Sequence, residues 1–504
     1  MRIRKKHLIR LGLAVTAGLT AILAVFVFVC PEAPLDIAGS LKNHNLVVIV
    51  IDALRADHLG CYGYHRDTSP FIDSLADGGM VFQRALSNSS FTRESVSVLF
   101  SGRLPSSSGS VGWFSAPSGK NDNLAGLFQR AGYATALLSN SPQVKHPNFQ
   151  TGFDHVELLH SQWGSRGDSG GGPRLSGRAL AFARKNTDRK FMMYLHYLDP
   201  HGPYNPPPEF MQRFRSEEFS HPVSLYNTVR WHCHRLMQEG FGPGEARFED
   251  MVLRYDAEIA LVDHSIQLLV QGLQKLGLDR NTLLVVTADH GEEFLEHDFV
   301  AHAWTLYNES LHVPLIVWAP GMVVPRRVAS RVSLVDLLPT LLTIMDIPHG
   351  RDDFDGTRLF QTRRNGFAFT APQKPFIAEL QIQHRNLLRA VILDQRKYIR
   401  ARRWLPPDER PGVFSTKGRT IEYNTDRHLN IWGPVVHEEW YDLSTDPWER
   451  RMLAVDERSR ELARILNQYE KATRGRGMPP NRPGMKKRTL SKKEKAKLKT
   501  LGYL

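Results

Sequence analysis

Two apolar stretches, each ending in an acidic residue, constrain the fold of this chain most. Residues 45–52 are NLVVIVID, and residues 281–289 are NTLLVVTAD. A continuous run of β-branched and other apolar residues predicts a strand that is buried on both faces, as in a parallel sheet. Similar runs occur at residues 190–199 (KFMMYLHYLD) and 312–320 (HVPLIVWAP). The pattern therefore predicts a central, mostly parallel sheet covered on both sides.

Segments with helical periodicity lie between these strands. Residues 122–132 (DNLAGLFQRAG) and 255–277 (YDAEIALVDHSIQLLVQGLQKLG) repeat apolar residues at helical spacing. Strands that alternate with helices indicate an α/β fold. The chain has 504 residues, about the length of one large α/β domain and a smaller one. We place the large domain at residues 45–348. Shorter alternating segments then predict a smaller α+β subdomain at residues 349–470.

The N-terminal residues predict a membrane anchor. Residues 1–10 contain five Lys and Arg residues, and the next twenty, 11–30 (LGLAVTAGLTAILAVFVFVC), contain no charge and can span a bilayer. Positive charge before the span predicts that this end stays in the cytoplasm. No small-x-small cleavage site follows, so we expect an uncleaved signal anchor. Residues 31–44 would be a linker to a catalytic domain on the periplasmic or extracellular side.

The net charge of +13 is concentrated at the two ends of the chain. Residues 1–10 and the basic tail at 471–504 contain much of the excess, which favours a membrane-surface or topological role over nucleic-acid binding. A solvated tail without a partner remains the alternative. The three cysteines, Cys30, Cys61 and Cys233, are too few for a disulfide framework and form no CxxC pair. The sequence leaves a Cys61–Cys233 bridge open.

Residues at the ends of the predicted strands are the first candidates for chemistry. Asp52 and Asp289 each follow a buried strand, and His290 comes next. Ligands bind at the carboxyl ends of the strands in open α/β sheets. Two carboxylates and an imidazole suit a divalent metal such as Zn²⁺ or Mn²⁺. The alternative is that each residue only caps a helix or turn.

Several segments, in order, resemble the sulfatase family of the alkaline phosphatase superfamily, from about residue 45 to the last residue. The matching segments are VIVIDALRADHLGCYGYHRDTSPFIDSLADGGMVF, FMMYLHYLDPHGPY, TADHGEEFLEHDFVAHAWTLYNESLHVPLIV, SLVDLLPTLL, EEWYDLSTDPWE and LKTLGYL. The resemblance implies a sulfatase-like sandwich around a mostly parallel sheet, with a smaller C-terminal subdomain. It also implies a metal-dependent hydrolase of anionic esters, sulfate or phosphate, on a glycan or a lipid.

The segment that resembles the family's nucleophile motif has lost the usual nucleophile. Residues 89–105 are SSFTRESVSVLFSGRLP, and the family pattern is Cys-x-Pro-Ser-Arg, four residues, then Thr-Gly-Arg. Matching its end to residues 101–103 places Thr92 at the cysteine that sulfatases convert to formylglycine. Glu94 and Val96 replace the proline and arginine of the modification signal, and threonine is not its substrate. Superfamily relatives that transfer phosphoethanolamine or phosphoglycerol use an unmodified threonine here.

A second register of this segment is possible. It would place Ser89, Phe91 and Arg93 at the cysteine, proline and arginine, but it breaks the spacing to residues 102–103. We therefore prefer Thr92 as the nucleophile and as an additional metal ligand. A threonine ester cannot expel sulfate by collapsing to an aldehyde, so water or an acceptor alcohol must attack it. This favours phosphoryl chemistry, or a hydrolase that activates water well.

Three functions follow from the resemblance and its departures. The first is an ester hydrolase that acts through Thr92, and the second is a phosphoethanolamine- or phosphoglycerol-type transferase at the membrane. The third is a catalytically silent module that binds an anionic surface polymer. By resemblance, His201 and His302 would serve the leaving group. His297 is a weaker candidate, and we interpret His196 as structural.

Further departures concern charge around the metal. Residues 139–141 are Ser-Asn-Ser, where sulfatases usually carry a Lys-x-His pair that holds the anionic ester. Ala53 stands where many sulfatases have a further metal-binding aspartate, and His290 replaces a frequent asparagine. We therefore expect one divalent ion, Mn²⁺, Zn²⁺ or Ca²⁺, with a transition metal favoured. We also expect Arg55 to brace a turn, and Arg103 to hold the helix after the nucleophile.

Overall fold

The computed structural model describes most of the chain between residues 35 and 473. The described residues are 35–112, 122–159, 171–214, 232, 234–349, 354–382, 386–403, 414–416, 419–421 and 435–473. The predicted anchor at 11–30, Cys30, Cys233 and the tail from residue 474 lie outside them. Within the described ranges, no helix is both long enough and apolar enough to cross a bilayer. Cys61 is a buried free thiol.

A nine-stranded central sheet forms the core, with the strand order β10-β3-β11-β7-β2-β6-β4-β5 and with β12 paired to β3. The five strands from β7 to β5 are parallel to their neighbours, whereas β11 is antiparallel to both β7 and β3. The strands are β2 (Asn45–Ile51), β3 (Met80–Leu86), β4 (Ala134–Ser139), β5 (His155–Leu158), β6 (Phe191–Tyr197), β7 (Thr282–Ala288), β10 (His312–Val313), β11 (Leu315–Trp318) and β12 (Arg326–Ser333). The predicted α/β class is confirmed, and the sheet, predicted to be mostly parallel, is mixed.

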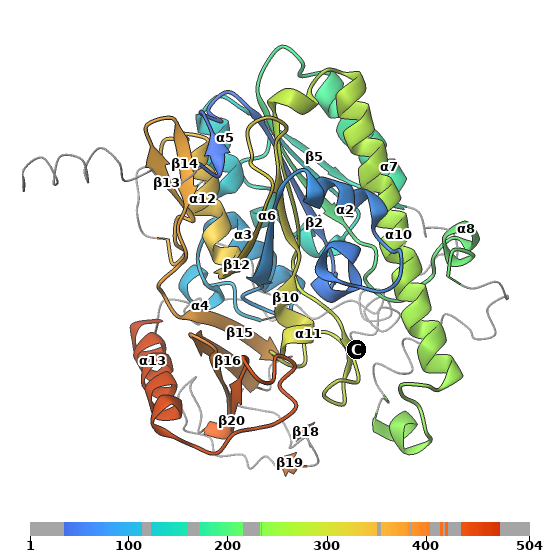
Figure 1. Cartoon of the computed structure of the whole chain (residues 1–504), viewed down its shortest axis with the longest axis vertical. Coiled ribbons are helices and arrows are strands. Elements are labelled where there is room, and N and C mark those ends of the chain that lie inside the picture. The colour runs from blue at the N-terminus through green and yellow to red at the C-terminus, as the bar shows by residue number, and fades with distance from the viewer. Residues whose placement is uncertain are drawn as a thin grey trace, which may run out of the picture.

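Helices cover both faces of this sheet, as the apolar strands require. The helices α2, α7 and α10 lie on one face, and α3, α5 and α12 lie on the other (Figure 1). Their bounds are α2 (Pro70–Asp77), α3 (Thr92–Ser101), α5 (Leu124–Arg130), α7 (Gly171–Arg184), α10 (Ala246–Lys275) and α12 (Leu337–Ile344). Every residue of β2, β6 and β7 is buried between these layers. The central strands therefore have no solvent-facing side.

The predicted strand at 312–320 is divided in two. Pro314 separates β10 from β11, because proline has no N–H to donate to a strand partner. Short elements complete the core: η1 (Ala56–His58), η2 (Gly60–Tyr62), α4 (Pro105–Ser108), η3 (Pro142–Lys145), α6 (Pro147–Gln150), α8 (Pro208–Met211), η4 (Asp279–Asn281), β8 (Glu293–Phe294), β9 (Val300–Ala301), α11 (Asn308–Leu311) and η5 (Leu334–Asp336). A three-stranded sheet joins β1 (Ile37–Ala38), β13 (Phe360–Arg363) and β14 (Gly366–Phe369).

The C-terminal part of the chain forms a β-rich subdomain below the main sheet (Figure 1). Its four-stranded antiparallel sheet has the order β15-β16-β17-β20, and α13 packs on β16 and β17. The elements are β15 (Phe376–Ile382), β16 (Asn386–Leu393), β17 (Arg396–Arg403), β18 (Phe414–Thr416), β19 (Arg419–Ile421), β20 (Val435–Asp442) and α13 (Glu457–Thr473).

Buried polar contacts attach the subdomain to the core. The Glu379 carboxylate accepts hydrogen bonds from the backbone N–H of Ser106 (2.8 Å) and from Arg389 Nε (2.6 Å). Arg389 and Glu379 are both almost fully buried, so each charge depends on its partner. Asn88, in the loop before α3, donates to the carbonyl of Ile377 at 2.7 Å. The subdomain therefore contacts the segments on either side of α3.

Candidate active site

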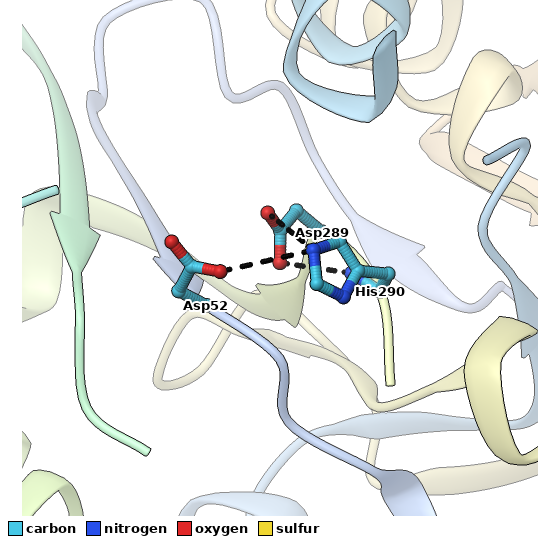
Figure 2. Close-up of side chains that lie close together, drawn as sticks. All are labelled: Asp52, Asp289 and His290. Atoms are coloured by element: carbon cyan, nitrogen blue, oxygen red, sulfur yellow. Dashed lines mark hydrogen bonds and ion pairs between the residues drawn. The ribbon is translucent and has the colours of Figure 1, made fainter. Parts of the chain in front are cut away.

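Asp52 and Asp289 lie side by side because β2 and β7 are adjacent and parallel. Ile51 pairs with Ala288 at the ends of these strands, so both acids emerge at the same edge of the sheet. Asp52, Asp289 and His290 point toward one another (Figure 2). One ligand atom from each lies within 4.8 Å of the other two, and all three residues are buried. In the part of the chain that the structure describes, this is the only such group of three or more His, Cys, Asp or Glu residues.

The His290 ring is fixed so that Nε2 faces the carboxylates. Its Nδ1 lies 2.8 Å from the carbonyl oxygen of Gly291, which can only accept a hydrogen bond, so Nδ1 bears a proton. In the neutral ring, Nε2 then has the lone pair that a metal requires. Nε2 lies 3.5 Å from Asp289 Oδ2 and 3.8 Å from Asp52 Oδ1.

One oxygen of Asp289 is buried without a hydrogen-bond partner. Asp289 Oδ1 accepts from the backbone N–H groups of Ala53 (3.1 Å) and His290 (2.8 Å). Asp289 Oδ2 has no such partner among the described residues, although the side chain is fully buried. A buried carboxylate oxygen with no donor is costly, and a divalent cation would satisfy it. The donor set therefore fits a divalent metal, with Asp52, Asp289 and His290 as ligands.

The two carboxylates titrate differently because of their neighbours. Burial alone raises the pKa of Asp52, but His201, His196 and His290 outweigh it and hold that pKa at about 2. For Asp289, burial and the negative charge of Asp52 raise the pKa to about 6. The site thus holds two close acids whose repulsion a bound cation would offset.

Thr92 lies against this group. Its Oγ1 is 3.1 Å from His290 Nε2 and 3.4 Å from Asp52 Oδ1. Thr92 is the first residue of α3, so the positive end of the helix dipole and the free N–H groups of the first turn are next to it. In the second register the nucleophile would be Ser89, whose hydroxyl instead donates to Glu94 at 2.6 Å.

The two histidines predicted to serve the leaving group lie next to each other, and one of them, His302, lies beside His290. The ring of His302 is 4.4 Å from that of His290 and 4.8 Å from that of His201, measured between centroids. All three are buried, and His201 Nδ1 lies 2.7 Å from the carbonyl of Gly202. His302 Nδ1 lies 3.1 Å from Glu292 Oε1, a contact that orients the ring. The structure thus brings all six residues predicted for the site into one cluster: Asp52, Thr92, His201, Asp289, His290 and His302.

Two further residues reach Asp52, and the sequence interpretation missed both. His196 Nε2 lies 3.4 Å from Asp52 Oδ2, and Ser141 Oγ donates to the same oxygen at 3.1 Å. His196 was interpreted as structural, and Ser141 only as part of a lost basic pair. The pairing of Val50 with His196 between β2 and β6 would have identified His196, once the strand order was known.

Two other candidates lie elsewhere. His297 is held through both ring nitrogens, by Glu309 Oε1 at 2.5 Å and by the carbonyl of Glu449 at 3.1 Å. Arg55 Nε donates to Asp57 at 2.9 Å, and Arg55 Nη1 contacts the carboxylate of Glu296. Arg55 therefore braces its turn, as predicted. Arg103 directly follows Gly102, which ends α3 in a left-handed conformation with φ of 63°.

Known proteins match this chain in sequence and in fold. Residues 44–347, more than half of the chain, match the sulfatase family. The uncharacterised sulfatase YidJ of Escherichia coli is 26% identical over 345 residues, which is 61% of this chain and 69% of that protein. Arylsulfatase K of Bos taurus is 30% identical over 199 residues, which is 34% of this chain and 35% of that protein. The match therefore spans about a third of arylsulfatase K.

Two solved structures share the fold. One, in complex with its substrate D-glucosamine-2-N,6-O-disulfate, has a TM-score of 0.67 at 18% identity and covers 86% of this chain and 98% of its own. The other is the phosphonate monoester hydrolase of Agrobacterium radiobacter. It has a TM-score of 0.57 at 18% identity, and the match covers 86% of this chain and 96% of that protein. Together with the family match, these findings show that the chain belongs to the sulfatase family, whose members hydrolyse sulfate esters.

Proposed function

We propose that this sulfatase-family hydrolase is metal-dependent and uses Thr92 as its nucleophile, with phosphorus esters as the favoured substrates. The observation that carries the proposal is the position of Thr92 Oγ1, 3.1 Å from His290 Nε2 and 3.4 Å from Asp52 Oδ1. A hydroxyl becomes a competent nucleophile when a cation or a base lowers its pKa. Asp52, Asp289 and His290 would hold a divalent ion, which supplies positive charge to the hydroxyl and to the ester oxygens.

In this mechanism the chain's own residues attack the ester and move the proton. Thr92 Oγ gives up its proton to solvent before the ester binds, and the alkoxide attacks phosphorus as the bond to the leaving oxygen breaks. This step produces a phosphorylated Thr92, and the later release of Thr92 returns the alkoxide. The leaving oxygen takes a proton from His302, whose ring lies beside His290, or from His201, whose ring lies beside His302. Glu292 holds His302 through Nδ1 at 3.1 Å, so the ring keeps one orientation. Water then attacks phosphorus, returns the proton to a histidine and releases Thr92.

The side chain at position 92 favours phosphorus over sulfur. Threonine cannot form the aldehyde hydrate through which a formylglycine expels sulfate, so its ester must be cleaved by an incoming nucleophile. The phosphonate monoester hydrolase among the fold neighbours is named for the hydrolysis of a phosphorus ester. Attack by an acceptor alcohol in place of water would make the same site a transferase, which is the second candidate.

A nitrophenyl ester panel tests the proposal. The full-length protein in detergent is assayed with Mn²⁺, Zn²⁺ or Ca²⁺ against sulfate, phosphate monoester, phosphate diester and phosphonate esters. We expect turnover of a phosphorus ester, and its loss in Thr92→Ala. Sulfate turnover that requires Thr92 would contradict the favoured substrate but keep the nucleophile. A protein that binds no metal and cleaves no ester would support the silent binding module.

We also propose that the protein is a single-pass membrane protein with this domain outside the cytoplasm. The support is the uncharged stretch at 11–30, preceded by the five cationic residues of 1–10. The test adds protease to intact cells or spheroplasts. Degradation of the domain from outside is expected, and full protection with recovery in the soluble fraction would contradict the proposal.

A further inference from the structure

His196 is buried in the site without a hydrogen bond to either ring nitrogen. It lies on β6 next to β2, and its side chain is 0% exposed. Among the described residues, neither Nδ1 nor Nε2 has a hydrogen-bond partner, and Nε2 lies 3.4 Å from Asp52 Oδ2. Buried polar groups are rarely left this way, so the ring's position calls for a functional reason.

The two oxygens of Asp52 face different neighbours. Oδ1 faces the site: Thr92 Oγ1 is 3.4 Å away, and His290 Nε2 is 3.8 Å away. Oδ2 faces the other way, toward His196 Nε2 at 3.4 Å and Ser141 Oγ at 3.1 Å. Ser141 donates a hydrogen bond to Oδ2, and His196 Nε2 lies at ion-pair distance from it, so both contacts limit rotation of the carboxylate about its last side-chain bond. The contacts on Oδ2 therefore decide where Oδ1 points.

His196 lies behind Asp52 rather than among the ligands. Among the described residues, the group whose ligand atoms lie within 4.8 Å of one another contains Asp52, Asp289 and His290 and does not include His196. The neighbouring strand β4 ends at Ser139, and the residue that follows it, Asn140, is not basic. Asn140 Oδ1 accepts a hydrogen bond from the backbone N–H of Leu198 at 2.7 Å. Ser141 and His196 both reach Asp52 from this side.

We infer that His196 is a positioning residue that, together with Ser141, holds Asp52 Oδ2 so that Oδ1 is presented to the metal and to Thr92. The inference rests on the proposed metal-dependent function and adds to it a residue outside the ligand set. Groups that orient a metal ligand typically change metal affinity about 10- to 100-fold when they are removed. His196 and Ser141 act on one oxygen, so their effects should not be additive.

The test measures Zn²⁺ binding directly by calorimetric titration of metal-free, full-length protein in detergent. We expect one ion per wild-type chain, about 10- to 100-fold weaker binding in His196→Ala, and a smaller loss in Ser141→Ala. His196→Gln places an amide N–H near the position of Nε2 and should restore most of the affinity. His58→Ala is the matched control, because His58 is also a buried imidazole paired with a buried carboxylate, Asp256, at 2.8 Å. It should lower the melting temperature without changing Zn²⁺ affinity.

Each outcome separates this inference from the proposed function. Wild-type binding that His196→Ala leaves unchanged would overturn the inference and keep the proposed function. A wild-type protein that binds no divalent ion would overturn both. Two ions in the wild type and one in His196→Ala would make His196 a ligand, which also contradicts a positioning role. If His196→Ala fails to fold, Ser141→Ala, which removes a single oxygen atom, gives the decisive affinity.

Discussion

Thr92 Oγ1 lies 3.1 Å from Nε2 of His290, the ring nitrogen that is left to accept once Nδ1 has donated to Gly291. This contact joins a helix N-terminus to a strand end, two elements that are 198 residues apart in the chain. The hydroxyl is buried, so a base or cation beside it acts with little screening by water. This position places the Thr92 hydroxyl where the proposed mechanism requires a nucleophile.

Two substitutions of Thr92 separate the contribution of its hydroxyl to catalysis from that of its side-chain volume. Thr92→Ala should lower kcat by at least about 10³-fold, whereas Thr92→Ser, which keeps the hydroxyl, should retain a measurable part. Acid quench during turnover, followed by peptide mass analysis, should find one phosphoryl group on Thr92 in the wild type. Thr343→Ala is the control, because its hydroxyl donates to Pro339 within α12. A phosphoryl group on Ser89 would favour the second register of the nucleophile segment.

Metal binding should stabilise the fold through Asp289. A ligand at about 100 times its Kd adds about 2.7 kcal/mol to the free energy of unfolding, so Zn²⁺ should raise the Tm of the wild type. Asp289→Asn should abolish this rise, because it removes the charge of the buried oxygen that has no donor. Asp279→Asn, in η4 beside the opposite end of β7, should leave it unchanged. An equal Tm rise in Asp289→Asn and Asp279→Asn would show that the metal binds at another site.

The sequence allowed the core of the fold to be predicted, but not all its connections. Apolar runs such as 45–51 and 282–288 have no polar face, so only a sheet covered on both sides suits them. Strand order and direction depend on contacts between distant segments, which periodicity does not encode. The antiparallel β11 could therefore not be predicted from its own residues.

Site residues were predictable where a motif places them at a strand end or a helix start. Asp52, Asp289, His290 and Thr92 are of this kind. His196 lies within an apolar strand, and its place beside Asp52 appears only when β6 is known to lie beside β2. Its position is therefore a consequence of topology rather than of local sequence.

Glu293 should make stability depend on pH. Burial, together with the charge of Glu309, raises its pKa to about 8. The folded state then holds a proton that the unfolded chain loses near pH 4.5. The resulting stabilisation is complete below that pH and is lost as pH rises toward 8. Glu293→Gln keeps a neutral side chain at every pH. The Tm of this variant minus that of the wild type should therefore rise between pH 5 and 8 and stay constant above pH 8. The exposed Glu209→Gln should show no such trend, and parallel curves for Glu293→Gln and wild type would contradict the prediction.

The segment that carries His302 depends on the C-terminal subdomain for support. Four of its residues have a positive φ between 66° and 78°: Leu295, Asp298, Ala301 and Ala303. This backbone conformation is unfavourable for residues other than glycine. Such a backbone persists only when its surroundings fix it. Glu449 provides three contacts: its Oε2 accepts from the N–H of Asn308 at 2.7 Å, its carbonyl faces His297 Nε2 at 3.1 Å, and its Oε1 pairs with Lys397 at 2.5 Å.

Removing the charge of Lys397 should therefore affect both stability and turnover. Lys397 and Glu449 are both 0% exposed, so Lys397→Met leaves a buried carboxylate without its cation and should cost about 3–5 kcal/mol in urea unfolding. Adding Glu449→Gln should recover much of that loss, because it removes the uncompensated charge. Under conditions where Lys397→Met and the double variant are both folded, kcat should fall more than metal affinity, because the change should displace His302 and leave the metal ligands in place.

The control is Arg458→Met, which breaks an exposed ion pair with Asp394 and should cost at most about 1 kcal/mol. Equal losses in Lys397→Met and Arg458→Met would show that the buried pair does not support the His302 segment.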